Sequence, residues 1–284
     1  MAQTARAIKR ALLSLLPPGP RIWVANSWPN LRKSMPEGLE LVFDGYLGDV
    51  RVNINTRFKV ERIMWSNAFE PALIQLIKHE ARPDWVALDI GANVGAVTLA
   101  LARFTAPTGI VHAFEPGPPN VQRLQANLAL NPGLAAQVTV HPAGVGEAPG
   151  QLRWQEEDGN PGNAMLGAHG THAVPVITLD DFTVQQGLSR LDFIKVDVEG
   201  MELSVFRGAR CTLRQFRPTI YFETLDRYGD EHGGNNFALL EQFLTGECQY
   251  RLYRLDREGR LHRVAGSGFA DYTVAVPAER SPQA

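Results

Sequence analysis

From Trp85 onward, short apolar runs alternate with amphipathic stretches, and this alternation excludes most fold classes. The short runs suit buried strands, whereas the stretches between them carry apolar residues at helical spacing. Strand–helix–strand order produces right-handed crossovers and a parallel sheet covered by helices on both faces. The late runs YRLYRLD, LHRVA and YTVAV predict an antiparallel edge at the C-terminal end. We therefore expect a doubly wound α/β fold. The earlier strands are expected in VALDI, GIVHAF, QVTVHPAGV, LDFIKVDV and PTIYFET.

Residues 1–68 are expected to form an extension to a main domain at 69–279. The stretch MAQTARAIKRALLSLL predicts a short amphipathic helix that ends at Pro17 and Pro18. The stretch LELVFDGYLGDVRVNI alternates in polarity around two glycines, which is typical of a β-hairpin. We expect the extension to pack on the core or to join copies of the chain as a homo-oligomer, with docking on a membrane surface as the alternative for the helix.

Composition narrows the range of partners. The 284 residues carry a formal net charge of −2, so no overall basic field favours nucleic acid. No run of eighteen apolar residues is present, so we expect no membrane span. The 2 cysteines have neither disulfide-framework nor zinc spacing, which favours a cytoplasmic protein.

The turn LDIGANVG, where the first parallel strand passes into a helix, indicates a nucleoside ligand. Gly91 and Gly95 let the chain bend and approach closely, and Asp89 supplies a carboxylate at the strand end. A nicotinamide fingerprint would need its second glycine where Asn93 stands. Glu115 closes the next strand, where an acidic side chain takes both ribose hydroxyls. Two carboxylates suit the sulfonium nucleoside S-adenosylmethionine better than a dinucleotide.

Five ordered motifs carry a resemblance to a known family: LDIGANVG, AFEPGPPNVQRLQANLALN, TLDDF, DFIKVDVEGMELSVFRGA and RPTIYFE. Over roughly residues 70–225 the chain resembles the FkbM family of S-adenosylmethionine-dependent methyltransferases. The resemblance implies a Rossmann-like methyltransferase sheet and methylation of hydroxyl groups on sugars, polyketides or other small molecules. The cofactor contacts that it implies are Asp89, Gly91, Asn93, Gly95, Glu115 and Pro116, with Ala143 and Gly144 at the adenine edge.

A second group of charged residues ends the next two strands: Asp197, Glu199 and Glu223. Two carboxylates 4 Å apart repel by about 4 kcal/mol at an effective dielectric of 20, so such a group must be spread out, partly protonated or neutralised. Asp197 and Glu223 are the candidate ligands of Mg²⁺ or another divalent cation. Any of the three carboxylates is a candidate general base. Lys195 is either a catalytic residue or a buried ion-pair partner, and Glu199 is alternatively a residue that stabilises a helix N-terminus.

The expected function is methyl transfer from S-adenosylmethionine to a hydroxyl group of a small molecule, with metal assistance as one form of it. The alternatives are N-methylation of a small molecule or peptide, a binding module without catalysis, and a nicotinamide-dependent oxidoreductase. The stretch DGNPGNAMLGAHG (residues 158–170) is expected to be a loop that serves as a lid or substrate rim, with a disordered connection as the alternative.

Overall fold

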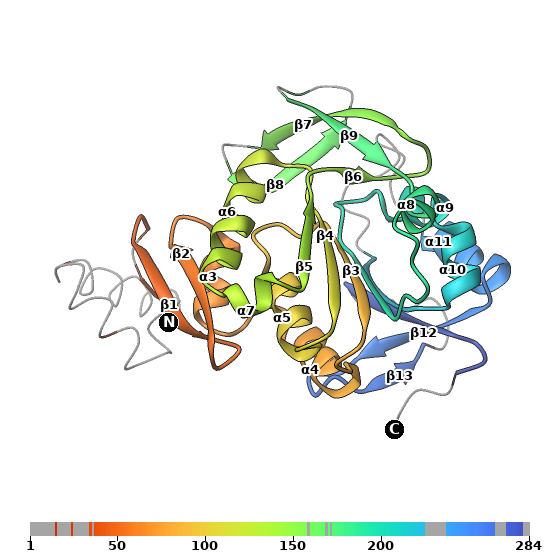
Figure 1. The fold of residues 1–284 in the computed structure, drawn as a ribbon, viewed down its shortest axis with the longest axis horizontal. Helices are drawn as coiled ribbons and strands as arrows, with labels where there is room; N and C mark the ends of the chain where they lie inside the picture. Colours follow the sequence, from red (N-terminus) through yellow and green to blue (C-terminus); the bar gives the residue numbers. More distant parts are fainter. Residues whose placement is uncertain are drawn as a thin grey trace, which may run out of the picture.

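An eight-stranded sheet forms the centre of the computed structural model (Figure 1). The structure describes residues 15, 24, 34–35, 37–157, 160–167, 170, 172–224, 237–264 and 271–280, with the backbone alone for 155–157 and 160–167. The strand order is β13-β12-β14-β11-β10-β3-β4-β5. Strands β11 to β5 run parallel and the other three antiparallel, which confirms the doubly wound fold with an antiparallel C-terminal edge. The strands are β3 (Val86–Ile90), β4 (Ile110–Phe114), β5 (Val138–His141), β10 (Phe193–Val196), β11 (Thr219–Glu223), β12 (Tyr250–Leu255), β13 (Leu261–Arg263) and β14 (Tyr272–Pro277).

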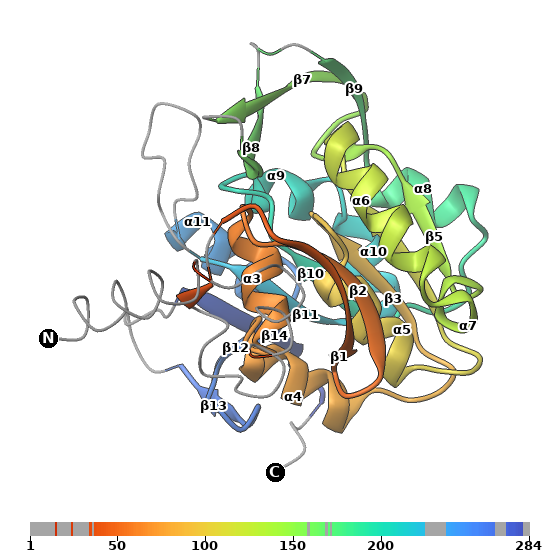
Figure 2. The same cartoon turned by 90° about the vertical axis from the view of Figure 1, so that its left-hand side faces the viewer.

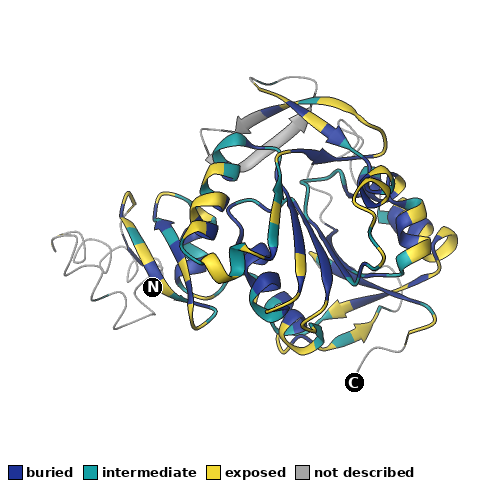
Figure 3. Cartoon of the chain, in the orientation of Figure 1, coloured by how far each residue is buried: buried dark blue, intermediate teal, exposed yellow. Residues whose placement is uncertain are grey.

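Helices cover both faces of this sheet, and the central strands are buried between them (Figure 3). Successive side chains of a strand point to opposite faces. Accordingly, Ala87 of β3 packs with α4 and α5, whereas Leu88 packs with α8, α9 and α10. The helices are α4 (Pro71–Glu80), α5 (Ala96–Phe104), α6 (Pro118–Ala129), α7 (Pro132–Ala135), α8 (Leu179–Gln185), α9 (Glu202–Arg207), α10 (Arg210–Phe216), α11 (Phe237–Glu241) and the π-helix η3 (Gln242–Glu247).

Local sequence determines where several of these helices begin. Gly95 has a φ of +91° and is the residue directly before α5. Pro118 is the first residue of α6, a position at which proline loses no helical hydrogen bond. Thr178 caps α8 by accepting a hydrogen bond from the amide of Asp181 at 3.1 Å. Gly95 and Pro118 thus start α5 and α6 a few residues after the carboxyl ends of β3 and β4.

The hairpin expected near the N-terminus is confirmed as β1 (Glu40–Tyr46) and β2 (Val50–Asn55). It is followed by α3 (Lys59–Trp65), and Figure 2 shows the hairpin in front of the sheet, beside α3 and α6. The Tyr46 hydroxyl donates to the carbonyl of Ala96 at 3.1 Å. Asn127 of α6 accepts from the amide of Asn53 at 2.8 Å. The hairpin is therefore docked onto the domain that carries the sheet.

A second sheet, which we did not predict, lies above the carboxyl ends of the central strands (Figure 1). Its order is β6-β9-β7-β8, and the expected loop at 158–170 instead contains strand β8, paired with β7. The single strand expected in QVTVHPAGV is also wrong: β5 ends at His141, and β6 belongs to the second sheet. Pro142 separates them because proline has no N–H to donate to a ladder. The strands are β6 (Gly144–Val145), β7 (Gly150–Glu157), β8 (Asn160–Gly167) and β9 (His172–Ile177).

Two expectations concern the chain ends and membranes. The helix expected before Pro17 lies outside the described residues, which include only Leu15 in that stretch. Within the described residues, every helix is too short or too polar to cross a bilayer.

Candidate active site

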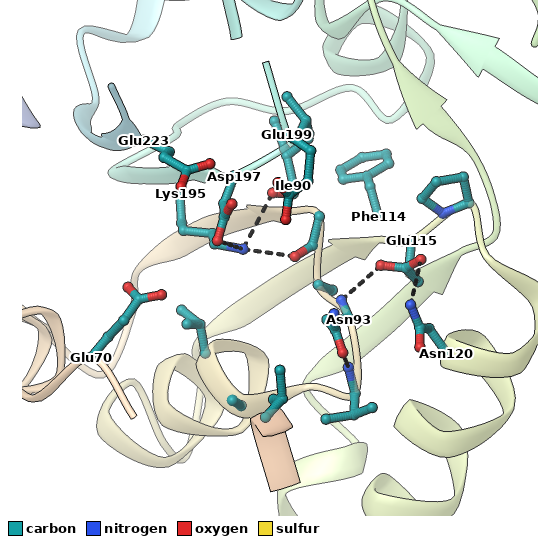
Figure 4. A pocket seen from close by; sticks show the side chains of 18 of the residues that line it. Glu70, Ile90, Asn93, Phe114, Glu115, Asn120, Lys195, Asp197, Glu199 and Glu223 are labelled. Carbon is teal, nitrogen blue, oxygen red and sulfur yellow. Dashed lines mark hydrogen bonds and ion pairs between the residues drawn. The ribbon is translucent and has the colours of Figure 1, made fainter. Parts of the chain in front are cut away.

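A cavity of about 320 Å³ opens at the carboxyl ends of β3, β4, β10 and β11 (Figure 4). This is where doubly wound sheets bind their ligands, and the volume lies within the range of small-molecule sites. The turns after these strands line one side, and residues from the start of α3 and from the segment before α4 line the other. The cavity therefore combines the sheet edge with the N-terminal extension.

The turn after β3 is folded tightly against its neighbours. Gly91 has a φ of +77°, and a Cβ at this position would overlap the carbonyl oxygen of Asp197. The amides of Gly91 and Ala92 both donate to the carbonyl of Phe114 at 2.9 Å. Asn93 also has a positive φ, of 52°, and its side chain accepts from the next amide. Gly91 therefore meets the expectation of a sharp bend without a side chain.

Glu115 directly follows β4, and hydrogen bonds hold its carboxylate in one orientation. Its Oε2 accepts from the amide of Asn93 at 2.7 Å, and its Oε1 accepts from the amide of Gly117 at 2.9 Å and from Asn120 at 3.3 Å. Burial raises the pKa of Glu115, and the two backbone hydrogen bonds act against that rise. A carboxylate fixed in this way can accept two neighbouring hydroxyl groups with its remaining lone pairs.

Lys195 is the buried cation at the base of the cavity. Its Nζ lies 3.4 Å from Asp89 Oδ1 and 3.7 Å from Asp197 Oδ2, and it donates to the carbonyl of Gly91 at 2.7 Å. Burial alone lowers the pKa of Lys195, but the surrounding carboxylates, Asp89 first, outweigh burial and raise the pKa overall. Lys195 is therefore a charged ion-pair partner that neutralises part of the acidic group.

Most of the residues expected to contact the cofactor line the cavity, but two do not. Asp89 is fully buried beneath it, where Thr98 donates to its Oδ2 at 2.6 Å, so the structure does not place it at the mouth as expected. Gly95 approaches Leu124 of α6 and not the ligand space. Those that line the cavity are Gly91, Asn93, Glu115, Pro116, Ala143 and Gly144.

The opposite end of the cavity is acidic. All four residues of the expected group line this end of the cavity: Lys195, Asp197, Glu199 and Glu223. Glu223 is only 4% exposed. Tyr272 of β14 closes this end and stacks on Tyr221 with ring centroids 5.1 Å apart. The structure thus brings the three carboxylates around one space, as the strand ends predict.

Among the residues of the wall that sequence reasoning missed, two bear on ligand binding. Glu70, directly before α4, points into the acidic end (Figure 4). Trp154 of β7 lines the cavity near Glu115 and lies against Gly117. Both come from elements outside the recognised motifs. For Glu70 the only sequence signal is an acidic residue before the proline that starts a helix, and Trp154 gives no signal without knowledge of the second sheet.

The structure gives little support for the expected binding of a divalent cation. Asp197 and Glu223 both line the cavity, but nowhere in the described part of the chain do three or more His, Cys, Asp or Glu side chains form a group that could hold a metal ion. Asp197 already has the ammonium of Lys195 as its counter-charge. Metal binding at this pair remains a prediction from the sequence.

The chain is similar to known methyltransferases. The family model described as "Methyltransferase FkbM domain" matches residues 89–252, which is more than half of the chain. "Methyltransferase 1" of Beauveria bassiana is 29% identical over 170 residues, covering 52% of this chain and 67% of the relative. "Hexuronic acid methyltransferase AglP" of Haloferax volcanii is 30% identical over 140 residues, covering 49% of this chain and 56% of the relative. "2-O-methyltransferase NoeI" of Sinorhizobium fredii is 26% identical over 172 residues, covering 54% and 68%.

The crystal structure of "Methyltransferase FkbM" from Methylobacillus flagellatus KT has 20% sequence identity and a TM-score of 0.48, covering 76% of this chain and 54% of that chain. The chain thus spans about half to two thirds of the length of these four relatives. The matched segment, residues 89–252, contains the carboxyl end of β3 and all of β4, β10 and β11, and the carboxyl ends of these four strands form the cavity. This chain belongs to the FkbM family of methyltransferases.

Proposed function

We propose that this methyltransferase uses S-adenosylmethionine and transfers the methyl group to a hydroxyl group of a small molecule. The observation that carries the proposal is the fixed carboxylate of Glu115 at the edge of the cavity. A carboxylate at the end of this strand is suited to both hydroxyls of a ribose. S-adenosylmethionine, when bound, supplies the electrophilic methyl group.

The hydrogen bonding of the turn after β3 favours a nucleoside over a dinucleotide. A pyrophosphate bound at such a turn needs free backbone amides. Here the amides of residues 91–95 all donate within the turn or to groups at the end of β4. The carboxylates that line the cavity would also repel phosphate groups. Both features argue against the nicotinamide alternative.

The acidic end supplies the groups that would handle the acceptor. Lys195 keeps its proton at neutral pH, so it is not a general base, and it holds Asp197 in place. Asp197, Glu199 and Glu223 are the candidates that accept the hydroxyl proton during attack. Holding two reactants aligned in a dry cavity can lower a barrier by roughly 7–11 kcal/mol, so a weak base is sufficient.

The names of two relatives support the proposed acceptor class. The name 2-O-methyltransferase specifies an oxygen acceptor, and the name hexuronic acid methyltransferase specifies a sugar acid as the small molecule. The hydroxyl groups of a sugar or a similar polyhydroxylated compound can donate hydrogen bonds to the three carboxylates at the acidic end.

The test is methyl transfer from S-adenosyl-[methyl-³H]methionine to a panel of hydroxyl and amine acceptors, with the products identified by mass spectrometry. We expect O-methylated product, and Asp197→Asn should lower turnover by about 10²-fold or more while changing the affinity for S-adenosylhomocysteine far less. N-methylated product would contradict the acceptor class. Unchanged turnover of Asp197→Asn would contradict its role.

A further inference from the structure

Glu70 occupies an unusual position in the cavity wall. It is the residue before α4, with φ 36° and ψ 60°, in the left-handed region that residues other than glycine rarely adopt. Its side chain lines the acidic end of the cavity and points toward Lys195 and Asp197 (Figure 4). An unfavourable backbone conformation that aims a side chain into a cavity is typical of a binding position.

The carboxyl of Glu70 is only partly satisfied by the protein. The Tyr221 hydroxyl hydrogen-bonds to it, but its Oε2 is buried and has no hydrogen-bond partner within the described residues. Lys195 forms its ion pairs with Asp89 and Asp197 instead. A buried carboxylate oxygen without a partner is costly, so its orientation is explained by a donor that arrives with the ligand.

Glu70 and Glu115 lie on opposite sides of the cavity (Figure 4). If Glu115 holds the ribose, as the proposed function requires, the amino-acid part of the cofactor extends along the turn after β3 toward the acidic end. This part carries a primary ammonium, which is a cation with three N–H donors. Asp197 already has a cationic partner, whereas no cation of the described residues forms an ion pair with Glu70.

We propose that Glu70 binds the α-ammonium group of S-adenosylmethionine. The inference rests on the proposed function, and it assigns a cofactor-binding role to a residue outside the segment that matches the family model. It also gives the segment between the hairpin and the sheet a part in cofactor recognition, because Glu70 lies directly before α4.

The test compares two ligands by calorimetry on the full-length protein. S-adenosylhomocysteine carries the ammonium, and S-(5′-adenosyl)-4-thiobutyrate lacks it but keeps the carboxylate and the nucleoside. We expect Glu70→Gln to weaken binding of S-adenosylhomocysteine by at least tenfold and binding of the desamino compound by less than twofold. Glu80→Gln, the same substitution at the other end of α4, is the matched control and should leave both affinities unchanged.

Three outcomes would overturn the inference: an equal loss for both ligands, no loss for S-adenosylhomocysteine, or a fall in turnover without a change in affinity, which would place Glu70 on the acceptor. If Glu70→Gln does not fold, Glu70→Asp retains the charge, and the same preference for S-adenosylhomocysteine should persist in weakened form. A wild-type protein that binds neither ligand would refute the proposed function itself, so the two failures are distinguishable.

Discussion

Gly91 lies where the turn after β3 meets the end of β10. A side chain there would overlap the carbonyl oxygen of Asp197, and the φ of +77° disfavours any other residue. The carbonyl of Gly91 also accepts a hydrogen bond from Lys195. Gly91 therefore connects the turn that lines the cavity to Lys195 and its buried ion pairs.

Replacing Gly91 by alanine should lower the free energy of unfolding by about 2–4 kcal/mol, because steric overlap adds to backbone strain. Gly187→Ala is the control, since Gly187 has a φ of +60° but open space around a Cβ, and it should cost only about 1 kcal/mol. Urea denaturation of both variants measures the difference. Equal losses of unfolding free energy in the two variants would show that the close approach of Asp197 does not require glycine at position 91.

Glu70 should make stability depend on pH. Burial, followed by the charge of Asp197, raises the pKa of Glu70 to about 7 in the folded protein. Between its ordinary pKa of 4.5 and about 7 the folded state keeps a proton that the unfolded state has released, so this residue's contribution to stability is lost as pH rises. Lys195, Asp89, Tyr221 and Tyr46 also interact electrostatically with Glu70.

Glu70→Gln should therefore gain stability relative to the wild type as pH increases, by about 1–3 kcal/mol between pH 5 and pH 8. Urea denaturation across this range measures the gain, with Glu80→Gln as the control. Taking the difference between variant and wild type removes contributions from other groups, including His112, whose pKa burial lowers to about 4. Parallel stability curves for Glu70→Gln and the wild type would contradict the elevated pKa.

The site residues that lie at strand ends could be identified from the sequence. Glu115 and Asp197 could be predicted because each directly follows a buried strand, and the carboxyl ends of such strands lie at the edge of the sheet where ligands bind. Asp89 also ends a strand, but the sequence does not reveal that Lys195 would bury it in an ion pair. Glu70 and Trp154 could not be predicted, because tertiary packing brings them to the cavity from elements outside the motifs.

At the element scale, the hairpin β1–β2 depends on α6 for its position. Asn127 is buried in this interface and accepts from the amide and the side chain of Asn53 while it donates to the carbonyl of Val94 at 2.8 Å. Arg123 of the same helix forms an ion pair with Glu61 and lies over the ring of Phe58. These contacts hold one wall of the cavity.

Asn127→Ala should cost about 1–3 kcal/mol, because it removes the hydrogen-bond partner of the part-buried amide of Asn53 and of the buried carbonyl of Val94. Amide hydrogen exchange should quicken in β2 more than in β3. The control is Gln125→Ala on the exposed side of the same helix, which should change stability by no more than about 0.5 kcal/mol. Unchanged exchange in β2 would show that the hairpin does not need this contact.

The two sheets show which elements the sequence reveals. The central strands are continuous apolar runs, so periodicity alone identifies them. Strand β8 has the sequence NPGNAMLG, whose glycines, proline and asparagines favour a loop, and it becomes a strand by pairing with β7. Tertiary context overrides local preference there, so the expected loop was the wrong interpretation.

Across the whole molecule, the cavity has the fixed carboxylate of Glu115 at one side and an acidic group at the other. A bound cofactor would bridge the sheet edge and the segment before α4. A ligand that binds only the folded state stabilises it, by about 2.7 kcal/mol at 100 times its dissociation constant. Cofactor binding should thus raise the free energy of unfolding of the domain.

Isothermal titration calorimetry with S-adenosylhomocysteine and, separately, with NAD⁺ distinguishes a methyltransferase cavity from a dinucleotide site. We expect S-adenosylhomocysteine to bind at one site, NAD⁺ not to bind, and Glu115→Gln to weaken the binding of S-adenosylhomocysteine by at least about tenfold. The thermal midpoint of the unliganded variant checks that it is folded. Binding of NAD⁺ without binding of S-adenosylhomocysteine would contradict the account.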